Sequence, residues 1–170
     1  MNCRYKDYAT YLAERFDGKV QKLTVDAGFT CPNRDGTLGR GGCIYCNNRS
    51  FSPVQAGGND IERQLEKAKR FFSRKYPQMR YLAYFQSYTN TYGETVDRLE
   101  ALYRRALAVD GVIGLIIGTR PDCMPDELLE RLAEINRSIR VIIEYGAETS
   151  HDSTPVSYTH LRAHETDSYL

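Results

Sequence analysis

Segments typical of buried strands alternate with segments typical of helices along most of this 170-residue chain. An amphipathic segment at 5–16 comes first, and strand-like runs then alternate with segments of helical periodicity. The expected strands cover residues 20–26, 80–86, 114–118 and 140–145, and the expected helices between them cover 60–75, 94–108 and 125–136. Because this alternation requires right-handed crossovers, it predicts a parallel α/β sheet.

Polar segments follow the ends of the expected strands. They are a cysteine-containing loop after residue 26, a turn at 86–91, a loop at 119–123 and the segment 144–148. In parallel sheets, ligand sites collect at the carboxyl ends of the strands. We therefore expect these segments to form one functional site at that edge.

Cys31, Cys43 and Cys46 lie within sixteen residues of the first of these loops. Three thiolates can hold three corners of a cubic iron–sulfur cluster and leave one iron open to a ligand. A Cys-x-x-Cys pair also occurs in zinc sites and redox disulfides, but no second pair follows downstream, as it would in a zinc ribbon. An odd total of five cysteines suits a reducing cytosol better than a disulfide framework, so we expect a cytoplasmic protein.

Two other classes of protein remain open at this point. One is a zinc-binding module, with or without an association with nucleic acid, which would use the same cysteines with a fourth ligand such as Cys3. A non-redox α/β protein would hold a phosphate-type ligand on the glycine-rich loop 36–42, although its spacing fits neither a P-loop nor a dinucleotide fingerprint. The net charge of +1 argues neither for nor against a nucleic-acid partner. The apolar run 112–117 is too short to span a bilayer, so no membrane partner is expected.

The cysteine loop and the segments after the later strands together resemble the radical S-adenosylmethionine (SAM) superfamily, and within it the YhcC/YtqA-like branch. The resemblance covers nearly all of residues 5–153. It is carried by LTVDAGFTCPNRDG at 23–36, GGCIYC at 41–46, AYFQSYTNTY at 83–92, GTRPD at 118–122 and EYGAET at 144–149. Eleven residues separate Cys31 from Cys43, where three are usual in the superfamily, and the longer loop is typical of this branch.

The resemblance implies a partial parallel β/α barrel of radical SAM type, with about four strand–helix units after an N-terminal helix. Cys31, Cys43 and Cys46 would bind a [4Fe–4S] cluster whose fourth iron chelates SAM. An electron, supplied by a donor such as flavodoxin or ferredoxin, would cleave SAM to a 5′-deoxyadenosyl radical that abstracts a substrate hydrogen. The branch is linked to side-chain modification of the tRNA wobble uridine, so tRNA is an implied partner.

The resemblance also implies contacts to SAM from the polar segments. Tyr45 would contact the adenine, the turn would hold the amino group, Arg120 would bind the carboxylate or a substrate anion, and two glutamates would bind the ribose hydroxyls or the amine. The turn residues are Gln86, Ser87, Thr89 and Asn90, and the glutamates are Glu144 and Glu148. Each position also has a structural interpretation: aromatic packing for Tyr45, helix capping for the turn, and ion pairs for Arg120 and the glutamates.

Residues 60–80 are locally basic, with seven lysines and arginines against three acids. A solvated helix face explains this composition, and a surface that contacts RNA phosphates would explain it as well.

The last residues, 154–170, have neither periodicity nor a motif and resemble a translated sequencing-adapter artefact. We therefore expect part of a radical SAM core at 1–153 and a non-native or disordered tail at 154–170. Four units are too few to close a barrel, and the apolar strand 141–143 would then form an edge without its partner. Poor solubility and impaired activity are expected for such a fragment.

Overall fold

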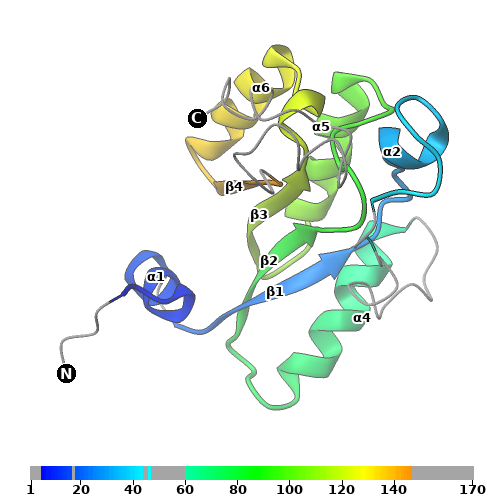
Figure 1. Cartoon of the computed structure of the whole chain (residues 1–170). Coiled ribbons are helices and arrows are strands. Elements are labelled where there is room, and N and C mark those ends of the chain that lie inside the picture. The colour runs from blue at the N-terminus through cyan, green and yellow to red at the C-terminus, as the bar shows by residue number, and fades with distance from the viewer. Residues whose placement is uncertain (1–4, 17, 44–45, 47–59, 147–170) are drawn as a thin grey trace.

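A computed structural model of the chain describes residues 5–16, 18–43, 46 and 60–146, which form a mixed α/β fold around a four-stranded sheet. The strands are β1 (Val20–Val25), β2 (Arg80–Phe85), β3 (Val112–Thr119) and β4 (Arg140–Tyr145), and they lie side by side in that order. All three strand pairs are parallel, so the predicted parallel sheet is confirmed (Figure 1). The boundary expected at residue 154 lies outside the described residues.

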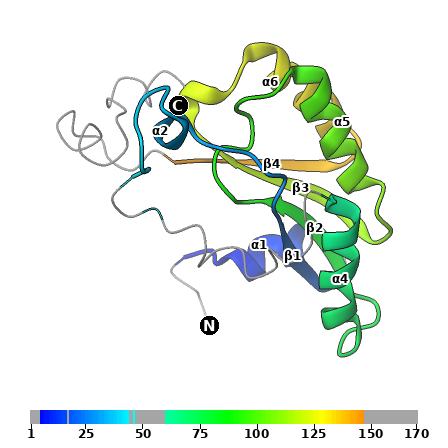
Figure 2. The same ribbon diagram turned by 90° about the vertical axis from the view of Figure 1, so that its right-hand side faces the viewer.

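Three long helices form a layer on one face of this sheet (Figure 2). They are α4 (Ile61–Ser73), α5 (Val96–Leu107) and α6 (Asp126–Asn136). Asp60 and Thr95 cap α4 and α5, because their side-chain oxygens accept hydrogen bonds from the backbone N–H groups of Arg63 and Arg98. A capping residue keeps an extended backbone, so both helices begin one or two residues after their expected starts.

The main core lies between the sheet and this helix layer. Every second residue of the strands faces this core, and the apolar sides of the three helices pack against these residues. Its fully buried members include Leu23, Phe85, Leu115 and Ile117 from the strands and Leu65, Leu99, Tyr103 and Leu128 from the helices. Burying such side chains contributes roughly 1.5–3 kcal/mol each, which makes this layer the main source of stability.

The other face of the sheet carries α1 (Tyr8–Arg15), which lies on the opposite side from α4 (Figure 2). Leu12 of α1 packs on Leu82 of β2 and Ile116 of β3 in a small second cluster. None of the helices in the described part of the chain is long and apolar enough to cross a membrane.

Candidate functional site

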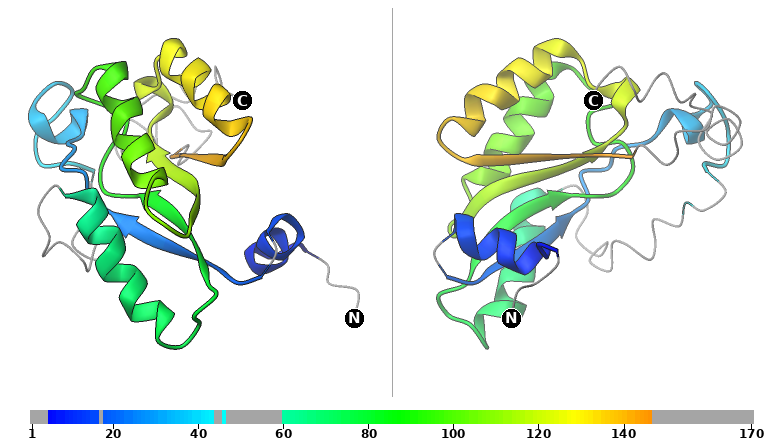
Figure 3. Two further views of the ribbon diagram at one scale, coloured as in Figure 1. Left: turned by 180° about the vertical axis from the view of Figure 1, so that it is seen from behind. Right: turned by 60° about the vertical axis from the view of Figure 1, so that its left-hand side comes forward.

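The loops after β1, β2 and β3 contact one another at the carboxyl edge of the sheet. The backbone N–H of Thr89 donates to the Thr30 carbonyl in the loop after β1 at 3.1 Å, and the Thr91 hydroxyl donates to the Cys123 carbonyl in the loop after β3 at 2.5 Å. Figure 3 shows the first part of the cysteine loop beyond the ends of the strands at this edge. The expected gathering of these three loops is therefore present in the structure.

The cysteine loop begins with a short helix that the sequence analysis missed, α2 (Pro32–Asp35). Cys31 is its N-cap residue, and Gly36 follows the helix with a φ of 103°. The signal was available, because proline at the first helical position and glycine directly after the last are typical start and stop residues. The loop then folds back on α2, since the N–H of Gly42 donates to the Asn33 carbonyl at 2.9 Å.

This fold-back brings the three cysteines into one neighbourhood. All three are partly buried, and the N–H of Cys46 donates to the Cys43 carbonyl at 3.0 Å. Burial raises the pKa of Cys46, Arg34 opposes that effect, and the Cys43 and Cys31 thiols add to it. The amide nitrogen of Asn33 donates to Cys43 Sγ at 3.2 Å. Such hydrogen bonds to sulfur are one way in which proteins tune metal–thiolate centres.

The three thiols have the donor chemistry of an iron–sulfur cluster. The described residues contain no three cysteine, histidine or acidic side chains that already converge on a metal ion, so the three thiols are neighbours and not a formed chelate. Tyr45, Glu148 and Cys3, which the sequence analysis considered as further contacts, lie outside the described residues.

The turn after β2 contains buried oxygens that have no partner. Ser87 and Asn90 are 2% and 0% exposed, and within the described residues nothing donates a hydrogen bond to Ser87 Oγ or Asn90 Oδ1. A buried polar atom without a partner costs about 1–3 kcal/mol and calls for an explanation. A ligand with hydrogen-bond donors, such as an ammonium group, would satisfy both acceptors. Of the other predicted turn contacts, Gln86 is partly buried and Thr89 is buried.

The same turn holds a residue in a costly conformation. Tyr88 has a φ of 64°, the one positive value outside glycine among the described residues. A left-handed non-glycine residue costs about 1–3 kcal/mol, and such residues cluster at functional sites. The guanidinium of Arg34 lies 5.4 Å from the centre of the Tyr88 ring, so the cysteine loop contacts this turn.

Asn90 also has a structural role. Its Nδ2 donates to the carbonyls of Phe85 at 2.9 Å and Gly118 at 2.8 Å. The backbone carbonyl of Asn90 accepts a hydrogen bond of 2.7 Å from the Tyr103 hydroxyl. The side chain thus ties the end of β2 to the end of β3. Because Nδ2 already faces two carbonyl oxygens, the oxygen Oδ1 must be the atom that remains without a partner.

Arg120 forms an ion pair, which was one of the two interpretations that the sequence left for this residue. Its Nε and Nη2 donate to the two carboxylate oxygens of Asp122 at 2.9 and 2.6 Å, and the side chain is 10% exposed. Burial alone would lower the pKa of Arg120, but Asp122 raises it above its ordinary range. The guanidinium is therefore a fixed positive charge at the carboxyl edge.

Glu144 lies on the α1 face of the sheet, where it also forms an ion pair. Lys22 Nζ lies 2.9 Å from Oε1, and the Tyr84 hydroxyl donates to Oε2 at 2.6 Å. Burial, with the adjacent Glu144, raises the pKa of Tyr84 above its ordinary range. The sequence analysis missed Lys22 and Tyr84, although a lysine between the apolar positions of a strand was a usable signal.

This ion pair also reports on the shape of the sheet. Lys22 is on β1 and Glu144 is on β4, the two edge strands of the four. In a flat sheet these strands would be about 14 Å apart, and side chains that stand upright on it would not meet. Their contact at 2.9 Å therefore requires the sheet to twist or curve, so that these two positions approach each other on the α1 face.

A fourth cysteine, Cys123, lies in the loop after β3. Burial raises the pKa of Cys123 to about 12, and the adjacent Asp122 contributes. At pH 8 only about one thiol in ten thousand would then be ionised, against about a quarter of ordinary cysteines. We expect iodoacetamide to modify Cys123 more than about 100-fold more slowly in the native chain than in urea, as measured by peptide mass spectrometry. Similar rates in the two states would contradict this environment.

A pocket of about 440 Å³ lies beside these loops. It is bounded by α2 on one side and by the loops after β2 and β3 on the other, and its lining includes Pro32, Leu38, Thr91 and Cys123. Thr37 and Tyr92 share a hydrogen bond of 2.8 Å between the cysteine loop and the loop after β2. The site therefore combines thiols, buried acceptors and a cavity at one edge of the sheet.

Curated proteins from several organisms are similar to this chain. It is 44% identical over 144 residues to the protein YhcC of Escherichia coli K12, a match covering 84% of this chain and 45% of that protein. It is 37% identical over 168 residues to the uncharacterized protein YtqA of Bacillus subtilis, covering 98% of this chain and 51% of YtqA. It is 32% identical over 158 residues to the uncharacterized protein MJ0486 of Methanocaldococcus jannaschii, covering 88% and 46%.

The chain thus spans about half the length of the curated relatives it matches. No family model matches the chain, and no solved structure matches it. The names of these relatives state no activity.

Proposed function

We propose that this chain forms part of a radical SAM enzyme core, in which Cys31, Cys43 and Cys46 hold a [4Fe–4S] cluster. The observation that carries the proposal is that the loop with three partly buried cysteines contacts the loop after β2 at the carboxyl edge of a parallel sheet. Three thiols leave one iron of a cubic cluster open, and the adjacent buried acceptors provide a place for a polar ligand of that iron.

The sheet is proposed to be a segment of a parallel β/α barrel. The strand order follows the chain order, α4, α5 and α6 lie on one face, and the opposite face carries only α1 among the described helices packed on the sheet. This is the arrangement that a parallel barrel requires, with helices outside and side chains of the strands inside.

The bound cluster would supply the electron that cleaves SAM, and this chemistry belongs to the cofactor. The residues of the chain would bind and orient SAM. Ser87 Oγ and Asn90 Oδ1 would accept hydrogen bonds from its ammonium group, and Arg120, held by Asp122, would attract its carboxylate. Because these groups are buried, they would also keep water away from the reacting atoms.

The partners follow from the same proposal. An electron donor such as flavodoxin or ferredoxin would reduce the cluster in the cytoplasm, where thiols stay reduced. We also propose tRNA as the substrate class, on the strength of the resemblance and of the basic segment 60–80.

Anaerobic reconstitution with iron and sulfide tests the cluster. We expect about four irons and four sulfides per chain, and an EPR signal of the reduced protein that changes when SAM is added. Cys43→Ala should lose most of the iron. Cys123→Ala is the matched control and should keep it, because Cys123 lies outside the cysteine loop.

Ser87→Ala tests the proposed SAM contact separately. It removes a hydroxyl that has no partner in the described structure, so the fold should be unaffected while SAM perturbs the EPR signal only at higher concentration. A folded protein that repeatedly takes up stoichiometric zinc, and neither iron nor sulfide, would overturn the proposal in favour of a zinc-binding module.

A further inference from the structure

Two side chains of the short helix α2 reach the sulfur atoms of the cysteine loop. Asn33 is buried, and its amide nitrogen donates to Cys43 Sγ at 3.2 Å. Its neighbour Arg34 interacts with the thiol of Cys46, both as a hydrogen-bond partner and through its charge. Two consecutive residues therefore each contact a different cysteine of the proposed cluster site.

Two further contacts fix the position of the Arg34 side chain. A β-carbon at Gly42 would lie 2.8 Å from its Nη1 and 3.2 Å from its Cγ, so the side chain passes closely over this glycine, next to Cys43. The guanidinium carbon also lies 5.4 Å from the centre of the Tyr88 ring. Tyr88 belongs to the turn after β2, so the guanidinium lies between the cysteine loop and that turn.

Within the described residues, no carboxylate pairs with Arg34. The carboxylate of the next residue, Asp35, accepts a hydrogen bond from the backbone N–H of Thr37 at 2.9 Å. Residues 36–59, which form the rest of the loop, contain no aspartate or glutamate. The cysteine thiolates are therefore the anionic groups that the structure places against this guanidinium.

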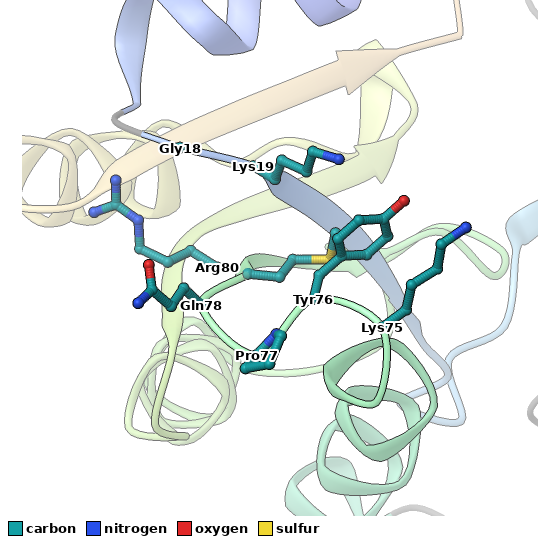
Figure 4. A pocket seen from close by; sticks show the side chains of 8 residues that line it. Gly18, Lys19, Lys75, Tyr76, Pro77, Gln78 and Arg80 are labelled. Atoms are coloured by element: carbon teal, nitrogen blue, oxygen red, sulfur yellow. The ribbon is translucent and has the colours of Figure 1, made fainter.

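Cations at the other edge of the sheet lie too far away to act on these sulfurs. Lys19, Lys75 and Arg80 border a pocket of about 660 Å³ where β1 and β2 begin (Figure 4). The strands between this pocket and the cysteine loop have six residues, which separates the two by about 20 Å. This exceeds the Debye length of about 8 Å at physiological ionic strength. A cation that acts on the sulfurs must lie beside them, as Arg34 does.

We propose that Arg34 stabilises the reduced state of the cluster bound by Cys31, Cys43 and Cys46, and so raises its reduction potential. The inference rests on the proposed function, because it presupposes that cluster. Reduction adds one negative charge to the cluster and its thiolates, and an adjacent cation attracts this charge. Hydrogen bonds to the sulfurs and the local net charge both set the potentials of iron–sulfur clusters. The guanidinium of Arg34 contributes both, and the cluster would therefore accept an electron from its donor more readily.

Redox titration of the reconstituted full chain with dithionite, followed by EPR without SAM, tests this role. Arg34→Gln keeps side-chain N–H groups and loses the charge. Arg34 is exposed, so solvent screens part of its charge. At a fixed potential the variant should lower the ratio of reduced to oxidised cluster about tenfold, which corresponds to a midpoint potential about 59 mV lower for one electron. Arg34→Lys keeps the charge and should recover most of the difference.

Arg40→Gln is the matched control for the loss of charge. Arg40 is an exposed arginine of the same loop, and its side chain passes Gly36 instead of Gly42. The ratio of reduced to oxidised cluster should therefore stay within twofold of that of the unaltered chain.

Gly42→Ala displaces the guanidinium without removing it. Gly41 and Gly42 have φ values of 96° and 86°, so an added β-carbon strains the backbone at either position. At Gly42 it would meet Arg34, whereas at Gly41 no described atom lies within 4 Å of it. Gly42→Ala should therefore lower the midpoint potential more than Gly41→Ala, with iron and sulfide analysis showing that both variants carry the cluster.

Equal potentials of Arg34→Gln and the unaltered chain, with about four irons in each, would overturn the inference and leave the proposed cluster intact. A potential lowered as much by Arg40→Gln would also overturn it. If Arg34→Gln does not hold the cluster, the two glycine variants decide, and equal potentials there count against the role of Arg34. Absence of iron and sulfide from the unaltered chain would overturn the proposed function, and this inference with it.

Discussion

Gly114→Ala is expected to lower the free energy of unfolding by about 3 kcal/mol, because the strands around β3 leave no room for a β-carbon. A Cβ at this position would lie 2.6 Å from the Arg140 carbonyl oxygen of β4 and 2.8 Å from Leu82 Cδ2 of β2. The leucine can rotate away, but the carbonyl belongs to the neighbouring strand and can move only with it. Urea denaturation of the variant measures the change.

Gly118→Ala, in the same strand, is the control for this prediction. Its nearest obstacle, the Phe85 carbonyl oxygen, would lie 3.3 Å from the new Cβ, so a shift of a few tenths of an ångström is enough. We expect a cost of about 1 kcal/mol at most. Equal stabilities of the two variants would contradict the close approach of β3 and β4 at Gly114.

The order of elements could be predicted because each strand and helix has its own local pattern. The run 112–117 is apolar throughout, as expected for a strand buried on both faces, and the helices show one apolar stripe each. The bounds of β4 agree with the prediction, and β3 begins two residues earlier than expected. At that end a bulge sets Tyr81 opposite Val112 and Leu82 opposite Gly114, and nothing local in the sequence indicates that extra residue.

The parts of the site formed by residues close together in the sequence could be predicted. The parts formed by residues that only the folded sheet brings together could not. The spacing of the three cysteines is visible in the sequence, and so are the polar segments after the strands. The ion pair of Lys22 with Glu144 joins residues 122 positions apart on the two edge strands, and it forms only because the sheet brings these positions together in space. Likewise, the sequence does not reveal that the side-chain nitrogen of Asn90 donates to carbonyls at the ends of β2 and β3 while its side-chain oxygen has no partner among the described residues.

Asn90→Ala is expected to lower the free energy of unfolding by about 2 kcal/mol, since it removes the amide that donates to both the Phe85 and the Gly118 carbonyls, although the backbone N–H of residue 90 still donates to Gly118. Removal of the unpartnered Oδ1 offsets part of the cost, because a buried acceptor disappears with it. Tyr103→Phe is the comparison: it removes one hydrogen bond, to the carbonyl of Asn90, and should cost about 1 kcal/mol. Equal costs in urea denaturation would contradict the role of the amide.

Asn90→Asp removes the N–H donor of this side chain and keeps its shape, so it distinguishes the two contributions. The carboxyl group would face two carbonyl oxygens in a buried position, and both effects raise its pKa in the folded state above the unfolded value of about 3.9. The folded state then holds a proton that the unfolded state releases, so stability falls as the pH rises above about 4. The variant should therefore be less stable at pH 8 than at pH 5, relative to the unaltered chain. A pH-independent difference would mean that water reaches this side chain, and the buried acceptors of the turn would then no longer point to a ligand.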